Sequence, residues 1–180
     1  GWMNWGNSPG DMPFSQQMGF PCTLSLETFP EGIRMCKYPV REIGYLYEKT
    51  VEKQGISVKP GENPLADLEG ELLDIDVEIE AGSSSEFGFD IRGHKISYAV
   101  GDEDLSFNGT HALLPMVDGK ITLRILVDRT SIEIFGNGGR ISISSCVLLN
   151  PENRYLGFFS SSGTAKLAKV KISCLKSAWK

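Results

Sequence analysis

The stretch from Lys120 to Cys146, KITLRILVDRTSIEIFGNGGRISISSC, alternates apolar and polar residues in three runs that two short turns separate. A period of two over β-branched residues is typical of strands. Asn and Gly in the second turn tolerate the positive φ of tight hairpin turns. The stretch therefore predicts a three-stranded antiparallel meander.

The pairing within this meander can be predicted from its turns. A two-residue loop at 129–130 places Val127 opposite Ile132. The second turn leaves two registers open, because centring it on 137–138 or on 138–139 shifts the pairing by two residues and keeps the same face apolar. That face needs a second layer over it. Its side chains should be buried between two sheets: Leu123, Ile125, Val127, Ile132, Ile134, Ile141 and Ile143.

The opposite face of the meander mixes charged and apolar side chains, with Arg124, Leu126, Asp128, Glu133, Phe135 and Arg140. A carboxylate beside Leu126 and Phe135 needs an ion partner, so we expect Glu133 to be salt-bridged. The pairing puts Arg124 diagonally beside it, with Arg129 and Arg140 within reach. We expect this face to meet another domain or a sugar through Arg124, Asp128, Arg129, Glu133 and Phe135.

The rest of the chain continues the strand pattern after a different beginning. Residues 22–28 and 33–38 alternate and predict a hairpin. Pro39 opens a predicted linker helix over 39–54, since apolar residues recur at helical spacing in PVREIGYLYEK. Short strands without alternating helices indicate an all-β, two-sheet antiparallel sandwich over 55–180. Besides the meander, these strands fall at 73–80, 86–91, 95–100, 105–107, 112–116, 154–160 and 168–175.

Composition excludes several classes of protein. The net charge of -5 argues against a nucleic-acid partner, which requires clustered basic residues, and no apolar run is long enough for a membrane span. With two histidines and four scattered cysteines, we expect no metal site and no cofactor. The cysteines should be reduced, although Cys22 and Cys36 flank one hairpin and could bridge.

The acidic run Asp74-Ile-Asp-Val-Glu-Ile-Glu80 is a candidate for chemistry. Carboxylates two apart on a strand lie ~6.5–7 Å apart, within the separation of glycosidase carboxyl pairs. The run resembles the E-x-D-x-E strand of laminarinase-type glucanases, but Asp74 stands where their nucleophilic Glu should be. Strict alternation also fits a solvated face. A free-standing β-glucanase using Asp74, Asp76 and Glu78 therefore remains an alternative.

Two tryptophans lie in the irregular first segment, at Trp2 and Trp5. Aromatic residues on loops often meet a ligand, and tryptophan faces stack well on sugar rings. The alternative is that both tryptophans anchor a terminal loop by packing. Residues 1–10 contain no basic or apolar signal-peptide region, so a signal is expected upstream or the protein is cytosolic.

The run from Leu123 to Arg140, LRILVDRTSIEIFGNGGR, resembles the signature of the C-terminal β-sandwich of glycoside hydrolase family 32, the invertases, levanases and inulinases. Gly1-Trp2-Met3-Asn4-Trp5 is similar to the G-W-M-x-N-W of the last blade of that family's five-bladed propeller, with one residue fewer. Residues 24–26 and 38–43 resemble the blade's final strands and the entry to the linker. The resemblance covers most of the chain in family order.

The resemblance implies a concanavalin A-like sandwich behind a propeller remnant at 1–38. It also implies a parent enzyme that hydrolyses β-fructofuranosyl bonds of fructan or sucrose, exported to the periplasm, cell surface or medium. The family's catalytic motifs W-M-N-D-P-N-G, E-C and R-D-P are not in this sequence. Trp5 stands where the nucleophilic Asp should be, and tryptophan cannot act as a nucleophile.

Three hypotheses follow. The first is an accessory module, inactive alone, that supports its own catalytic propeller and places Trp2 and Trp5 nearest the sugar pocket. The second is a lectin-like carbohydrate-binding module, and the third is the glucanase at Asp74, Asp76 and Glu78.

Overall fold

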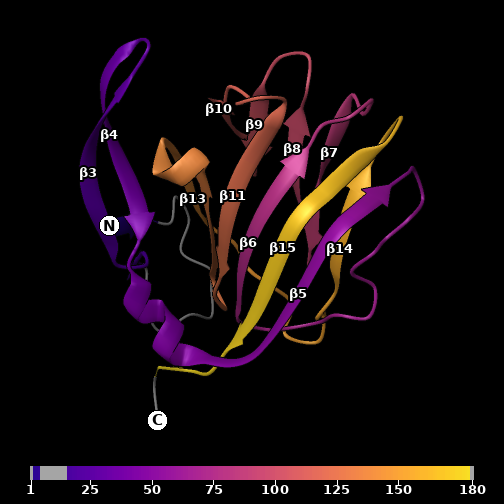
Figure 1. The fold of residues 1–180 in the computed structure, drawn as a ribbon. Helices are drawn as coiled ribbons and strands as arrows, with labels where there is room; N and C mark the ends of the chain where they lie inside the picture. Colours follow the sequence, from indigo (N-terminus) through magenta and orange to yellow (C-terminus); the bar gives the residue numbers. More distant parts are fainter. Residues whose placement is uncertain (1, 5–15, 179–180) are drawn as a thin grey trace.

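The protein is described here by a computed structural model that covers residues 2–4 and 16–178. Within these residues the chain forms two large antiparallel sheets and two small two-stranded ones (Figure 1). The front sheet has the order β13 (Ile141–Cys146), β12 (Ser131–Gly136), β11 (Lys120–Val127), β6 (Leu73–Glu80), β15 (Ala165–Leu175) and β5 (Tyr47–Val58). The back sheet has the order β10 (Thr110–Leu113), β9 (Asp104–Phe107), β8 (His94–Ala99), β7 (Glu86–Ile91) and β14 (Leu156–Ser160). The predicted antiparallel β-sandwich is confirmed.

The meander of β11, β12 and β13 has one of the two registers that its turns allow. Val127 pairs with Ile132, as expected from the loop at 129–130. Ile134 pairs with Ile143, which selects the second of the two possible registers. The turn is the short 3-10 segment η2 (Asn137–Gly139), whose residues have φ of 45°, 69° and 90°. Only Asn and Gly adopt three such angles in succession at low cost.

The core lies between the two large sheets. The apolar face of the meander is buried as predicted, except that Ile141 beside the turn is partly exposed. The back sheet contributes aromatic rings, with Phe89 and Phe158 edge to face at a centroid separation of 5.2 Å. Each fully buried Leu, Ile, Val or Phe stabilises the fold by roughly 1.5–3 kcal/mol relative to an exposed one.

The N-terminal part stands beside the front sheet (Figure 1). It contains the short pair β1 (Trp2–Asn4) and β2 (Gln16–Met18), and the predicted hairpin, formed by β3 (Cys22–Phe29) and β4 (Gly32–Pro39). Cys22 pairs with Pro39 and Cys36 with Ser25, so the two thiols are not cross-strand neighbours.

The predicted helix over 39–54 is wrong in type and extent. The segment forms a 3-10 helix, η1 (Arg41–Leu46), and the chain then enters the front sheet as β5. β5 pairs with β15 along almost its whole length, and this ladder outweighs the helical spacing of the sequence. The sandwich therefore begins at Tyr47 rather than at residue 55. No helix among the described residues is long and apolar enough to cross a membrane.

Candidate functional site

The second face of the meander is covered by the N-terminal part of the same chain. Leu126 and Phe135 are fully buried and form a second core cluster with Ile43 and Leu175. Partly buried side chains of the N-terminal part and its neighbours complete the cluster, among them Phe20, Tyr38, Val40, Leu46 and Tyr47. This face is therefore not open to a sugar, because residues 20–47 occupy it. We call this second face of the meander, with the residues 20–47 that cover it, the clamp face.

Glu133 lies at the centre of the clamp face with a relative exposure of 0%. Its Oε1 accepts a hydrogen bond of 2.6 Å from the backbone N–H of Phe20. Its Oε2 accepts one of 2.9 Å from Ser144 and lies 3.7 Å from Nζ of Lys37. Gly19 permits this approach, because a Cβ there would lie 2.9 Å from Oε1 of Glu133.

The expected ion pair of Glu133 exists, but the predicted partners are wrong. Lys37 on β4 supplies the charge, whereas Arg124 pairs with Asp74 and Arg140 with Glu31. Pairing within the meander could not reveal a partner that arrives from a hairpin far earlier in the chain. Lys37 also lies over the ring of Phe135, 5.5 Å from its centroid.

Arg124 forms a second buried contact on the clamp face. Its Nε and Nη2 donate to the two carboxylate oxygens of Asp74 at 3.1 and 2.8 Å, and its Nη1 donates to the carbonyl of Pro39 at 3.2 Å. Tyr47 donates its hydroxyl to Asp74 at 2.7 Å. Burial alone would lower the pKa of Arg124, but the bonds and charge of Asp74 outweigh it and raise that pKa. Burial and the bond to Asp74 raise the pKa of Tyr47 to about 12.

The acidic face of strand β6 is solvated as predicted at Asp76 and partly at Glu78 and Glu80, but not at Asp74. Asp74 is only 2% exposed and holds Arg124, so it is a structural anion. Glu78 accepts a hydrogen bond of 2.8 Å from Lys120, whereas Asp76 is exposed. Two of the three proposed glucanase carboxylates are thus engaged in ion pairs, which gives the glucanase hypothesis no support.

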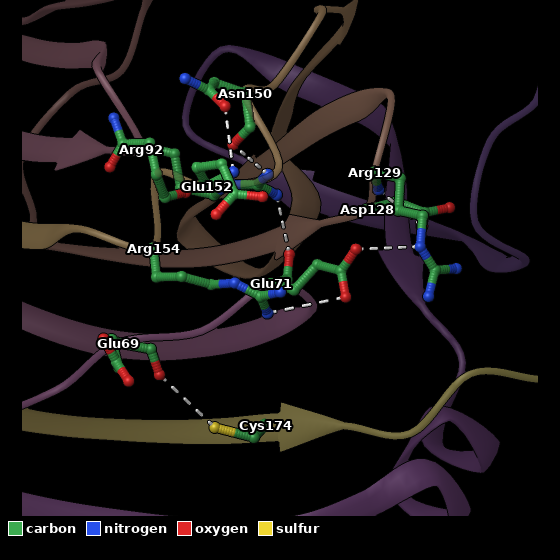
Figure 2. A network of polar contacts seen from close by, with 10 residues as sticks. Glu69, Glu71, Arg92, Asp128, Arg129, Asn150, Glu152, Arg154 and Cys174 are labelled. Atoms are coloured by element: carbon green, nitrogen blue, oxygen red, sulfur yellow. Dashed lines mark hydrogen bonds and ion pairs between the residues drawn. The ribbon is translucent and has the colours of Figure 1, made fainter.

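Arg129 and Asp128 lie at one end of the sandwich, in a network that does not include Glu133 (Figure 2). Nε of Arg129 donates to Oε1 of Glu71 at 3.0 Å, and Nη1 of Arg154 lies 3.6 Å from Oε2 of the same carboxylate. Asp128 accepts a hydrogen bond from the backbone N–H of Arg129 at 2.8 Å.

Arg92 organises the loops around this network (Figure 2). It is 3% exposed and donates to the carbonyls of Asn153, Glu71 and Asn150 at 2.7, 3.2 and 2.7 Å. Burial lowers the pKa of its guanidinium. The role of Arg92 was not predicted from the sequence. The one signal for it is the position of Arg92 before Gly93 in a tight turn, where Arg92 has a φ of 55°.

Of the two tryptophans expected near a sugar, one lies among the described residues. Trp2 lies on β1 with 69% of its surface exposed, while the neighbouring Met3 is buried. Trp5 lies outside the described residues. Their assignment to a sugar pocket stays a prediction.

Comparison with known proteins places this architecture in a family. Residues 42–173 match the family model described as Glycosyl hydrolases family 32 C terminal. The levanase of Bacillus subtilis (strain 168) is 31% identical over 99% of this chain and 30% of its own length. The levanase of Bacillus sp. (strain L7) is 32% identical over 99% of this chain and 22% of its own length. The raffinose invertase of Escherichia coli is 29% identical over 92% of this chain and 37% of its own length.

Among solved structures, an exo-inulinase from Aspergillus awamori superposes with a TM-score of 0.80 at 20% identity. The match covers 99% of this chain and 40% of that one, and at this identity it shows the fold. The chain thus spans well under half the length of these relatives. The resemblance found in the sequence is confirmed, and the chain belongs to glycoside hydrolase family 32, with the C-terminal sandwich domain of that family at residues 42–173.

Proposed function

We propose that this chain is the accessory module of a hydrolase that cleaves fructan or sucrose, and that it stabilises the catalytic propeller of that enzyme. The clamp face is the observation that carries the proposal. Glu133 accepts a hydrogen bond from the backbone of Phe20, and Arg124 donates one to the backbone of Pro39. The sandwich is therefore hydrogen-bonded to the chain at both ends of the hairpin β3–β4. Buried charges that bind backbone groups fix the position of a neighbouring element in addition to its packing.

The hairpin offers its free side to a further partner. It exposes apolar side chains, with relative exposures of 64% for Leu24, 76% for Leu26, 71% for Ile33 and 63% for Met35. Contiguous exposed apolar side chains mark interaction surfaces. We assign residues 1–38 to the last strands of the propeller and this apolar face to packing against the rest of it. Trp2 and Trp5 would then lie nearest the sugar pocket of the whole enzyme.

The attachment of the hairpin also depends on shape. A Cβ at Gly139 would lie 2.2 Å from the carbonyl oxygen of Lys37, so the turn η2 meets β4 backbone to backbone. Such an approach is possible only for glycine. The clamp face therefore combines hydrogen bonds, an ion pair and close backbone packing, as a permanent contact between two domains requires.

The site of action is proposed to be outside the cytoplasm. Two relatives carry the name extracellular exo-inulinase, from Aspergillus ficuum and Aspergillus niger. Substrates such as levan and inulin are large polymers, which are degraded outside the cell.

The decisive experiment measures fructose release from levan, inulin and sucrose. The 180-residue chain alone should release none, because the family's catalytic motifs are missing from it. In the complete enzyme, deletion of the sandwich from Tyr47 onward should lower the thermal midpoint and the activity together. Release of fructose by the chain alone, or a truncated enzyme of unchanged stability, would contradict the proposal.

A further inference from the structure

The back sheet has a hollow of ≈ 330 Å³ beside its edge strand β14. Strand alternation puts Asp90, Lys95, Gly157 and Phe159 on its outer side, opposite the core residue Phe89. Gly157, Asp90 and Lys95 form one row across three neighbouring strands. The hollow lies on the sheet that does not carry the clamp face.

Two aromatic rings border the hollow. Tyr155 is 48% exposed, and its hydroxyl lies 2.6 Å from the position that a Cβ on Gly157 would occupy. The ring of Tyr155 therefore extends across the strand at Gly157, where any larger residue would displace it. Phe159 follows on the same side, about 13 Å from Tyr155 by backbone rise. Nζ of Lys95 lies over its ring, 4.6 Å from the centroid.

Asn63 holds Tyr155 in place. Its Nδ2 donates to the hydroxyl of Tyr155 at 3.3 Å and to the carbonyl of Leu156 at 3.2 Å. Its Oδ1 accepts from the backbone N–H of Phe158 at 3.2 Å. The amide thus pairs with the edge of β14 as a neighbouring strand would, and it fixes the ring before any ligand arrives. Pre-ordered aromatic groups bind at a low entropic cost.

The polar groups of the hollow define the ligand. The Asp90 carboxylate accepts one hydrogen bond, from the backbone N–H of Gly93 at 2.9 Å, and a carboxylate has room for about four. Glu62 adds a second negative charge, whereas Lys95 is neutralised by Glu86 at 2.7 Å. This acidic balance disfavours phosphorylated or other anionic ligands.

We propose that this hollow is a binding site for a neutral oligosaccharide. Sugar rings present C–H faces that stack on aromatic side chains, here Tyr155 and Phe159, and their hydroxyls donate to a carboxylate such as Asp90. A concave site with aromatic walls and a few fixed polar groups is the usual form of a small-ligand site. The proposal depends on the hollow alone and not on the function of the parent enzyme.

The test is a nuclear magnetic resonance titration of the 180-residue chain with an inulin-type tetrasaccharide, cellotetraose and glucose 6-phosphate, each to about 10 mM. At least one neutral probe should saturate the amide shifts of Asp90, Gly157 and Phe159, and glucose 6-phosphate should not. No saturable shift with either neutral probe, or stronger binding of the phosphate, overturns the proposal.

Variants assign the binding to the aromatic wall. Tyr155→Ala should raise the Kd at least tenfold, whereas Tyr155→Phe, which keeps the ring, should stay within threefold. Gly157→Ala should also weaken binding, because its methyl group displaces Tyr155. The matched control is Tyr45→Ala, which removes a tyrosine that is 81% exposed on η1. Each variant is checked by its thermal unfolding, and an equal loss of binding in Tyr45→Ala would refute the assignment.

Discussion

Replacing Arg124 with Met should destabilise the chain by about 3–5 kcal/mol, the usual cost of breaking a buried ion pair. The structure explains this magnitude. Arg124 is 8% exposed and Asp74 is 2% exposed, and the substitution removes three hydrogen bonds from the guanidinium. Asp74 would keep the hydroxyl of Tyr47 but lose its counter-charge. The free energy of unfolding of a domain of this size is roughly 5–15 kcal/mol, so the substitution should remove a large share of it.

Urea denaturation followed by far-ultraviolet circular dichroism of the strands measures this loss. Arg41→Met is the matched control. The side chains of Arg41 and Glu42 are 94% and 55% exposed, so their ion pair should contribute under about 1 kcal/mol. The double variant Arg124→Met, Asp74→Leu should recover at least half of the loss, since no lone charge remains buried. A loss below about 1 kcal/mol for Arg124→Met, or a double variant as unstable as the sum of its single variants, would refute the reasoning.

Three further predictions concern the same face. Gly139→Ala should lower the free energy of unfolding by about 2–4 kcal/mol, through the clash with Lys37 and the strained φ. The control Gly138→Ala has open space around it and should lower it by about 1 kcal/mol. Equal losses for the two variants would argue against close backbone packing. The pKa of Tyr47 rises from 10.0 to about 12 on folding. The contribution of Tyr47 to the free energy of unfolding should therefore be fully present below pH 10 and be lost as the pH rises toward 12. Tyr47→Phe should flatten that fall, and an unchanged slope would speak against the assignment. Glu133→Ala should lower stability by about 2–4 kcal/mol and release the hairpin, seen as faster amide exchange at Phe20; unchanged exchange there would contradict the clamp.

The sandwich and its meander followed from local pattern. Alternation along β11 and β12, with Asn137 and Gly138 at the turn, determines the strands, the buried face and a choice between two registers. Which register is adopted depends on the conformation of the turn, and the sequence left that open.

The clamp face could be predicted only in part. Glu133 was expected to be salt-bridged, but Lys37 and Phe20 reach it from 96 and 113 residues earlier, which no local spacing reveals. The helical spacing at 39–54 was misleading for a related reason, because β5 gains its hydrogen bonds from β15 near the other end of the chain. Contacts distant in sequence decided both cases.

The edge strand β5 has a consequence for association between molecules. One side of its backbone pairs with β15, and no strand of the described residues pairs with the other side of its 12 residues. Such an edge is a template for the strands of other chains. Exposed Glu48, Lys49 and Glu52 place charges of both signs along it, and Gly55 with a φ of 69° bends it. A second molecule would have to desolvate these charges to add its own strand, so the edge resists aggregation.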